Sequence, residues 1–171
     1  MNGQNGVVTF RLCGQVFGLA VESVREVVPI AWLDRPPQTP SLVQGVLNLG
    51  GRAVPVLRLD RLMGLADGNF GIDASILIMR EVEGEQVMGL LVEHVDGVRS
   101  ADSFTAMGFC DRGSFNGCLA DQLDFKGQVV LLLAWRNLLL EEERQRLADF
   151  QAVTQARLAD LNATDSEGNA P

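Results

Sequence analysis

The sequence predicts a mainly β protein organised as two small barrels side by side, because one strand-rich pattern occurs twice. Residues 15–27 read QVFGLAVESVREV and residues 86–98 read QVMGLLVEHVDGV, and eight of the thirteen aligned positions are identical. A weaker match relates residues 51–59, GRAVPVLRL, to residues 127–135, GQVVLLLAW. The 18 glycines, set between short apolar runs, favour turns and strands over a helical bundle.

Each copy of the longer repeat is predicted to complete a hairpin. An apolar strand precedes each copy, at residues 7–12 and 75–80, and a turn joins it to the repeat, at residues 13–14 and 83–85. Beyond the repeated glycine the valines are spaced by three. This spacing predicts a short helical turn across the end of a sheet.

Proline and glycine mark the connections. Pro55 lies within an apolar run and has no N–H to donate, so it is expected at a strand edge or a bulge. Residues 35–40, RPPQTP, predict an extended loop. Residues 102–116 lack periodicity and predict a long surface loop that carries two of the three cysteines.

The chain divides into a domain, a helix and a tail. The domain of residues 1–140 contains the two repeats, at 7–62 and 75–138, and residues 141–161 form the predicted amphipathic helix. Residues 162–171 are polar and are expected to be disordered. Two roles stay open for the helix: packing on the barrels, or protruding to dimerise or to dock on a partner. Its predicted apolar face contains Leu140, Leu147, Phe150, Thr154, Leu158 and Leu161.

Charge and cysteine content limit the class of protein. The 22 acidic and 14 basic residues give a formal net charge of -8 without a basic stripe, so binding to nucleic acid or to an anionic membrane has no electrostatic basis. The polar first residues lack a signal-peptide pattern, and no apolar run is long enough for membrane insertion. The odd set Cys13, Cys110 and Cys118 then predicts reduced thiols in a cytoplasmic protein.

The sequence predicts no catalytic residue, no metal site and no cofactor. His94 is the only histidine, and no nucleophile motif accompanies it. Cys110 and Cys118 do not have a zinc spacing. Residues 45–52, GVLNLGGR, lack the Lys-Ser/Thr ending of a phosphate-binding loop. An enzyme is therefore disfavoured.

Three segments resemble the motifs of CheW-type chemotaxis adaptor domains. Residues 7–27 are similar to the opening strands and turn of these domains. Residues 45–57, GVLNLGGRAVPVL, resemble the motif G-V-x-N-L-R-G-x-x-V-P-V, and residues 87–98, VMGLLVEHVDGV, resemble V-G-L-x-V-D-x-V. The resemblance extends over residues 7–140 in the same order. It implies two five-stranded SH3-like barrels, in agreement with the repeat.

The resemblance also implies a non-enzymatic adaptor that couples chemoreceptors to a CheA-type histidine kinase in a chemosensory array, with other CheW-like proteins as array neighbours. One barrel is expected to bind the regulatory domain of the kinase, and the groove between the barrels is expected to bind the hairpin tip of the receptor. Among the receptor-binding positions given below, core packing of the valines and the leucine is an alternative at least as good as receptor contact. For Glu26, a solvated surface position and receptor contact are equal alternatives. The matching kinase-binding positions are Gly45, Asn48, Gly50, Gly51 and Arg52. The matching receptor-binding positions are Val24, Glu26, Val27, Val87 and Leu91.

Two positions depart from the family pattern. Gly50 replaces the usual arginine, and Arg58 stands where aspartate is usual; Arg52 is a substitute source of positive charge. These changes are expected to alter the partner surface, which suggests a non-flagellar or paralogous pathway. The alternative function is a ligand-sensing or regulatory β-barrel module without receptor coupling.

Overall fold

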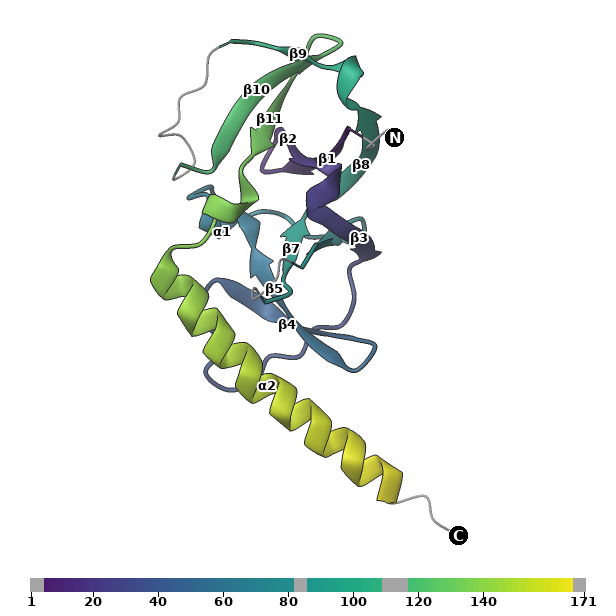
Figure 1. Ribbon diagram of the computed structural model, residues 1–171, viewed down its shortest axis with the longest axis vertical. Coiled ribbons are helices and arrows are strands. Elements are labelled where there is room, and N and C mark those ends of the chain that lie inside the picture. The colour runs from purple at the N-terminus through teal and green to yellow at the C-terminus, as the bar shows by residue number, and fades with distance from the viewer. Residues whose placement is uncertain (1–4, 82–85, 109–116, 168–171) are drawn as a thin grey trace.

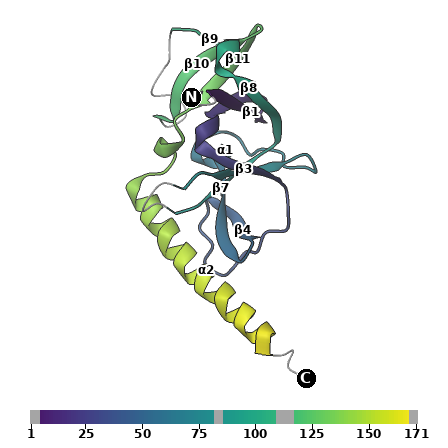
Figure 2. The same ribbon diagram turned by 45° about the vertical axis from the view of Figure 1, so that its right-hand side comes forward.

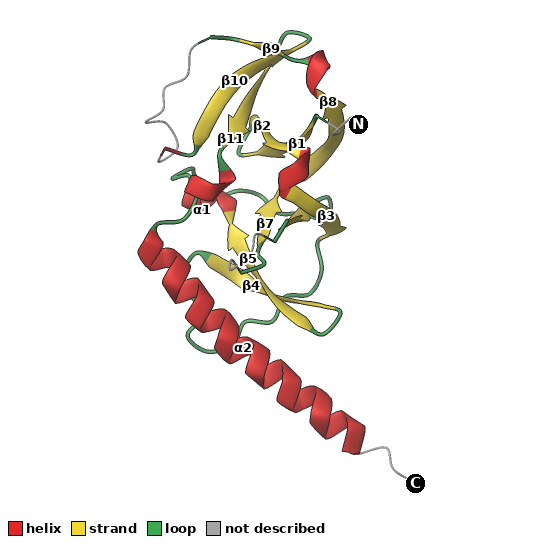
Figure 3. Cartoon of the chain, viewed as in Figure 1, coloured by secondary structure: helices red, strands yellow, loops and turns green. Residues whose placement is uncertain are grey.

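The computed structural model describes residues 5–81, 86–108 and 117–167. The described residues form a six-stranded sheet, a five-stranded sheet and a long C-terminal helix (Figures 1 and 3). This arrangement confirms the mainly β, two-subdomain fold that the repeat predicts. The sixth strand of the larger sheet is the two-residue β9, which the sequence analysis did not predict.

The first sheet has the order β8-β1-β2-β11-β10-β9. Its neighbours are antiparallel except for the parallel pair β2–β11. Its strands are β1 (Gly6–Leu12), β2 (Gln15–Ala20), β8 (His94–Ser100), β9 (Thr105–Ala106), β10 (Leu119–Phe125) and β11 (Gln128–Leu133).

The second sheet has the order β3-β6-β7-β5-β4, with the single parallel pair β5–β7. Its strands are β3 (Val24–Pro29), β4 (Val43–Leu49), β5 (Arg52–Arg58), β6 (Ser75–Met79) and β7 (Gly89–Val92). The helices are α1 (Leu59–Leu62), α2 (Glu141–Glu167) and the 3-10 turns Val21–Ser23, Ala101–Ser103 and Trp135–Asn137.

The two repeats exchange the strands that follow their first hairpins: β3, β4 and β5 join the sheet of β6 and β7, and β8 to β11 join the sheet of β1 and β2. The first repeat places β1 and β2 in the first sheet, but its β3 crosses to pair with β6 of the second repeat. Reciprocally, β8 of the second repeat leaves β6 and β7 and pairs with β1. Each sheet therefore contains strands of both repeats, and the chain passes from one sheet to the other at both crossings (Figure 2).

The predicted helical turn is correct only in part. In the first copy it is the 3-10 turn Val21–Ser23, and β3 begins at the next residue. In the second copy, β7 ends at Val92 and β8 begins at His94 without an intervening helix. The spacing of three misled because Val24 and Val27 both belong to β3, where Val24 is buried and Val27 is 43% exposed, so the valines do not mark one buried helical face.

The turn predicted at residues 13–14 is present, with φ of 51° at Cys13 and 75° at Gly14. Residues 83–85, the second predicted turn, lie outside the described residues. The predicted loop of residues 102–116 begins with the end of a 3-10 turn and β9, and its residues 109–116, with Cys110, are outside the description.

Pro55 lies in an interior strand, so its predicted edge position is wrong. It pairs with Val46 in the β4–β5 ladder, while β5 also pairs with β7 from Val56 onward. The backbone of Val46 instead exchanges two hydrogen bonds with Asp34, at 2.7 and 3.0 Å. Because the backbone of Val46 is turned toward Asp34, the position opposite it on β5 needs no N–H donor, and proline fits there.

Helix α2 packs on the second sheet, which confirms one of the two roles considered for it. Leu147 enters the core, and two glutamines one turn apart bind the backbone of β5. Gln151 Nε2 donates to the Ala53 carbonyl at 3.0 Å, and Gln155 Oε1 accepts from the Ala53 N–H at 2.8 Å. The side-chain amides thus satisfy a stretch of β5 that β7 does not reach.

The helix is longer than the sequence analysis predicted. It continues to Glu167 and not to residue 161, so the expected disorder of residues 162–167 is wrong. No glycine or proline occurs between Leu161 and Glu167, and the first terminating residue is Gly168. The C-terminal turns extend beyond the sheets (Figures 1 and 2).

The repeated glycines occupy equivalent crowded positions. A Cβ on Gly18 would stand 2.6 Å from Val7 Cγ1, and a Cβ on Gly89 would stand 2.7 Å from Ile76 Cγ2. Both neighbours are β-branched core residues with 0 to 6% exposure, so they have little room to move. The glycine conserved between the two copies is therefore required by packing.

Substitution of Gly89 by alanine is expected to destabilise the protein by about 1–3 kcal/mol, because the added methyl overpacks the core against Ile76. Urea unfolding measures this change. Gly71→Ala is the matched control, since a Cβ there has no neighbour within 4 Å. Equal stabilities of the two variants would contradict the packing role.

Candidate functional site

The tip of the β4–β5 hairpin brings together four of the five predicted kinase-binding residues. Gly50 and Gly51 form the two-residue turn, with φ of 61° and 87°, and Asn48 Oδ1 accepts a hydrogen bond from the Gly51 N–H at 2.8 Å. Arg52 follows and forms a bidentate ion pair with Glu81, at 2.5 and 3.3 Å. A positive φ at both turn positions favours glycine, which gives a structural reason for Gly50.

Gly45, the fifth predicted kinase-binding residue, lies apart from this tip. It is buried in β4, and a Cβ there would stand 2.7 Å from Leu33 Cβ and 2.9 Å from the Asp34 carbonyl. The segment that pairs with Val46 therefore covers it. A bulky side chain at Gly45 would disturb this packing before it met any partner.

The five predicted receptor-binding residues divide between the core and the surface. Val24, Val87 and Leu91 are at most 7% exposed and belong to the two hydrophobic clusters. For these three, core packing, the alternative considered above, is what the structure shows. Glu26 and Val27 lie on β3, an edge strand, where Val27 is 43% exposed. Glu26 is half-buried and forms an ion pair with Arg25 at 3.5 Å.

An exposed apolar patch continues from this edge. The Ile30 N–H donates to the Ala74 carbonyl at 2.9 Å, which prolongs the β3–β6 pairing beyond Pro29. Trp32 and Ile72 each lie two residues beyond this hydrogen bond and are 87% and 91% exposed. We call Val27, Ile30, Trp32 and Ile72 the β3-end patch. The sequence analysis did not select Ile30, Trp32 or Ile72.

Arg58 lies inside the protein, in an ion-pair network. It is 8% exposed and contacts the fully buried Asp60 through Nε at 2.9 Å and Nη2 at 2.5 Å. The same guanidinium reaches Asp67 at 3.2 Å and stacks over the Phe70 ring at 4.8 Å. The expectation that Arg58 alters a partner surface is therefore wrong, because its charge is neutralised internally.

The electrostatics of this network favour the ionised pair. Burial by itself raises the pKa of Asp60, but hydrogen bonds from Arg58 and from the Gly68 N–H lower it, and the net pKa is below the ordinary value. The hydrogen bond to Asp60 raises the pKa of Arg58. Together these contacts hold the loop after α1 against β5.

The same loop also reaches the first sheet and the crossing between β7 and β8. Cys13 Sγ contacts the Ala66 carbonyl at 3.2 Å, and Glu93 Oε1 accepts from the Asn69 N–H at 2.8 Å. Glu93 aligns with Glu22 in the repeat, and its hydrogen bond holds the loop in place. His94 is exposed, 3.6 Å from Asp96, and takes no part in this junction.

Comparison with known proteins shows what this fold is. The family model described as the CheW-like domain matches residues 6–143. The chain belongs to this family. The chemotaxis protein CheW of Klebsiella aerogenes is 28% identical over 144 residues, which cover 82% of this chain and 84% of that protein. CheW of Thermotoga maritima is 29% identical over 92 residues, which cover 54% of this chain and 59% of that relative's length.

The structural comparison agrees. The crystal structure of the scaffolding protein TtCheW from Thermoanaerobacter tengcongensis superposes with a TM-score of 0.69 and 21% identity, over 84% of this chain and 94% of that chain. The resemblance in the sequence is therefore correct, and so is the expectation that this CheW-like domain is an adaptor and not an enzyme. None of the described helices has the length and apolarity needed to cross a membrane.

Asp60→Asn is expected to lower stability by about 3–5 kcal/mol at neutral pH, because it removes the buried carboxylate partner of Arg58 and leaves only the exposed Asp67. The folded pKa of Asp60 is depressed. The contribution of its carboxylate is therefore complete above the unfolded pKa of about 3.9 and is lost as the pH falls through the lower folded value. Unfolding by urea between pH 2 and pH 7 measures this dependence.

Asp67→Asn is the matched control. Asp67 contacts the same guanidinium but its side chain is 75% exposed, so the loss should stay below about 1 kcal/mol. A difference between wild type and Asp60→Asn that stays constant from pH 7 to pH 2 would contradict the role given to the ionised pair.

Proposed function

We propose that this protein is a cytoplasmic coupling adaptor, which joins chemoreceptors to a CheA-type histidine kinase within a chemosensory array. The observation that carries the proposal is the match of the CheW-like domain model to residues 6–143. The relatives named chemotaxis protein CheW support it. The two partners are the regulatory domain of the kinase and the cytoplasmic hairpin tip of the receptor.

The geometry supports protein binding through the second sheet. The β3-end patch exposes a tryptophan and an isoleucine almost completely, and large exposed apolar side chains grouped together are typical of interaction surfaces. Tryptophan is also the residue most enriched among interface hot spots. We assign the kinase contact to this patch, with the β4–β5 tip around Asn48 and Arg52 as a second, polar contact.

The receptor contact is assigned to the edge of β3. Glu26 and Val27 are the two predicted receptor-binding residues whose side chains reach the surface. The crossing of β3 from one sheet to the other places them beside the junction of the subdomains. A paralogous pathway with its own kinase stays part of the proposal, because Gly50 is exposed at the β4–β5 tip where the family motif has arginine.

Each contact is expected to be weak by itself. Apolar burial contributes about 25 cal/mol per Å², and association and side-chain ordering offset most of that gain. Affinities on the order of micromolar, multiplied by repetition in an array, are sufficient for stable assembly. Calorimetric titration with the regulatory domain of a CheA-type kinase from the same organism tests the proposal. No binding to any such kinase would overturn it and favour the ligand-sensing alternative.

Trp32→Ala is expected to weaken kinase binding about 30-fold, the loss typical of truncating an aromatic hot spot. Thermal unfolding should be unchanged, because the side chain is 87% exposed. Val129→Ala is the matched control, an exposed apolar residue on β11 of the other sheet. Equal affinities of the two variants would exclude the β3-end patch as the kinase contact.

A further inference from the structure

Helix α2 has a second, exposed face beside the face that contacts the domain. Leu147, Gln151 and Gln155 hold one side of the helix to the second sheet. A stripe on the adjacent side contains Val153, which is 53% exposed, and four exposed charged residues. At 3.6 residues per turn these five positions share one face. They are Arg146, Asp149, Val153, Arg157 and Asp160.

The charges on this stripe have no ionic partner within the described part of the chain. None of the salt bridges there involves them, although Arg146 with Asp149 and Arg157 with Asp160 are spaced for contact along the helix. The Asp149 carboxylate accepts only a hydrogen bond from Gln145, at 3.0 Å. The stripe is therefore available to charges from outside the chain.

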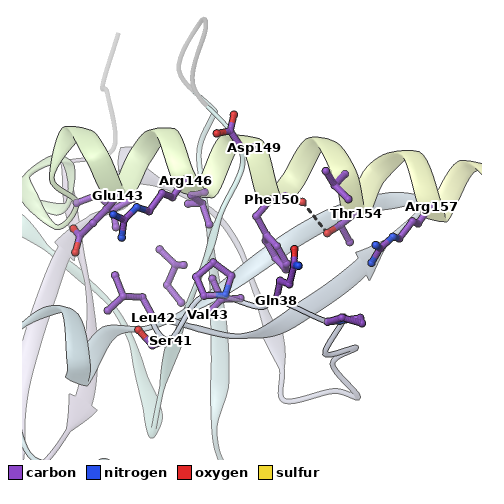
Figure 4. A pocket seen from close by; sticks show the side chains of 16 residues that line it. Gln38, Ser41, Leu42, Val43, Glu143, Arg146, Asp149, Phe150, Thr154 and Arg157 are labelled. Atoms are coloured by element: carbon purple, nitrogen blue, oxygen red, sulfur yellow. Dashed lines mark hydrogen bonds between the residues drawn. The ribbon is translucent and has the colours of Figure 1, made fainter.

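Four of the five stripe residues, all except Asp160, line a groove. It has a volume of about 650 Å³ and separates α2 from the loop around Pro37 and Pro40 (Figure 4). Phe150 points from the helix toward this loop, and Leu42 and Val43 line the opposite wall. The apolar wall borders the charged stripe, which is the composition of a helix-binding surface.

The order of the charges is self-complementary. Arg146 and Asp160 are each seven residues from Val153, and Asp149 and Arg157 are each four residues from it. Two such helices in antiparallel contact, centred on Val153, have Arg146 level with Asp160 and Asp149 level with Arg157. In a parallel pair each charge would instead lie level with its own copy, which is repulsive.

We propose that the partner of this stripe is α2 of a second copy of the chain, packed antiparallel about a two-fold axis at Val153. The same patch then serves both copies, as a two-fold interface requires. The pairing also gives the extended C-terminal turns of α2 a neighbour, and helices of this kind gain most of their stability from packing. This dimer is independent of the coupling function.

Sedimentation equilibrium of the full chain alone tests the dimer. Exposed ion pairs contribute little each, so the dissociation constant is expected to be on the order of 100 micromolar at low salt, and to increase with ionic strength. Arg157→Asp should increase the dissociation constant of the dimer at least about tenfold, because it places a carboxylate opposite Asp149 of the second copy. The double variant Asp149→Arg/Arg157→Asp should restore it, since opposite charges again face each other.

Ala159→Glu is the matched control, because it adds a charge to α2 at an exposed position outside the stripe. It should leave the dimer unchanged. Circular dichroism of each variant verifies that α2 remains folded. A chain that stays monomeric at millimolar concentration would overturn the proposal, and so would a dimer that the double variant fails to restore. Binding of a kinase or receptor helix by the stripe, without self-association, would likewise overturn it.

Discussion

The exchange of strands between the two repeats is the constraint on which the rest of the structure depends. Neither sheet can be completed by one repeat, because β3 closes the edge of the second sheet and β8 closes the edge of the first. The two repeats are thus joined to each other within each sheet by main-chain hydrogen bonds and not only by side-chain packing. A junction built in this way offers partners a stable surface at both crossings.

The loop after α1 reinforces the same junction with side chains. Its residues are held by Arg58 of β5, by Asp60 of α1, by Cys13 in the β1–β2 turn and by Glu93 at the second crossing. An ion pair this deeply buried is costly to form from solvated charges, and its value lies in fixing one arrangement of the loop.

Much of the fold could be predicted from the repeat, since identical spacing in two segments implies the same strands and turn. The crossings could not, because valines spaced by three favour a helix, whereas Val24 and Val27 both belong to the strand β3. The burial of Arg58 depends on its ion pair with Asp60, two residues away in sequence. The two side chains become buried only when the loop after α1 folds over them. Pro55 is tolerated because of Asp34, a contact with no local signal.

The candidate site was predictable mainly where the turn chemistry is local. Asn48, Gly50, Gly51 and Arg52 are brought together by one hairpin, whereas Val24, Val87 and Leu91 proved to be core. Trp32 and Ile72 each follow the pairing of Ile30 with Ala74, which joins distant segments, so their exposure was not visible in the sequence. Gln151 and Gln155 are four residues apart, so the sequence places them on one face of α2. A search for apolar periodicity alone does not detect such a polar contact face.

The most direct test of the coupling account is co-sedimentation of a CheA-type kinase with receptor-containing membranes, in the presence and absence of this protein. The account predicts that the kinase sediments with the receptors only when the protein is added, and that the amount saturates with it. Kinase that sediments equally without the protein, or that stays in solution with it, would contradict the account.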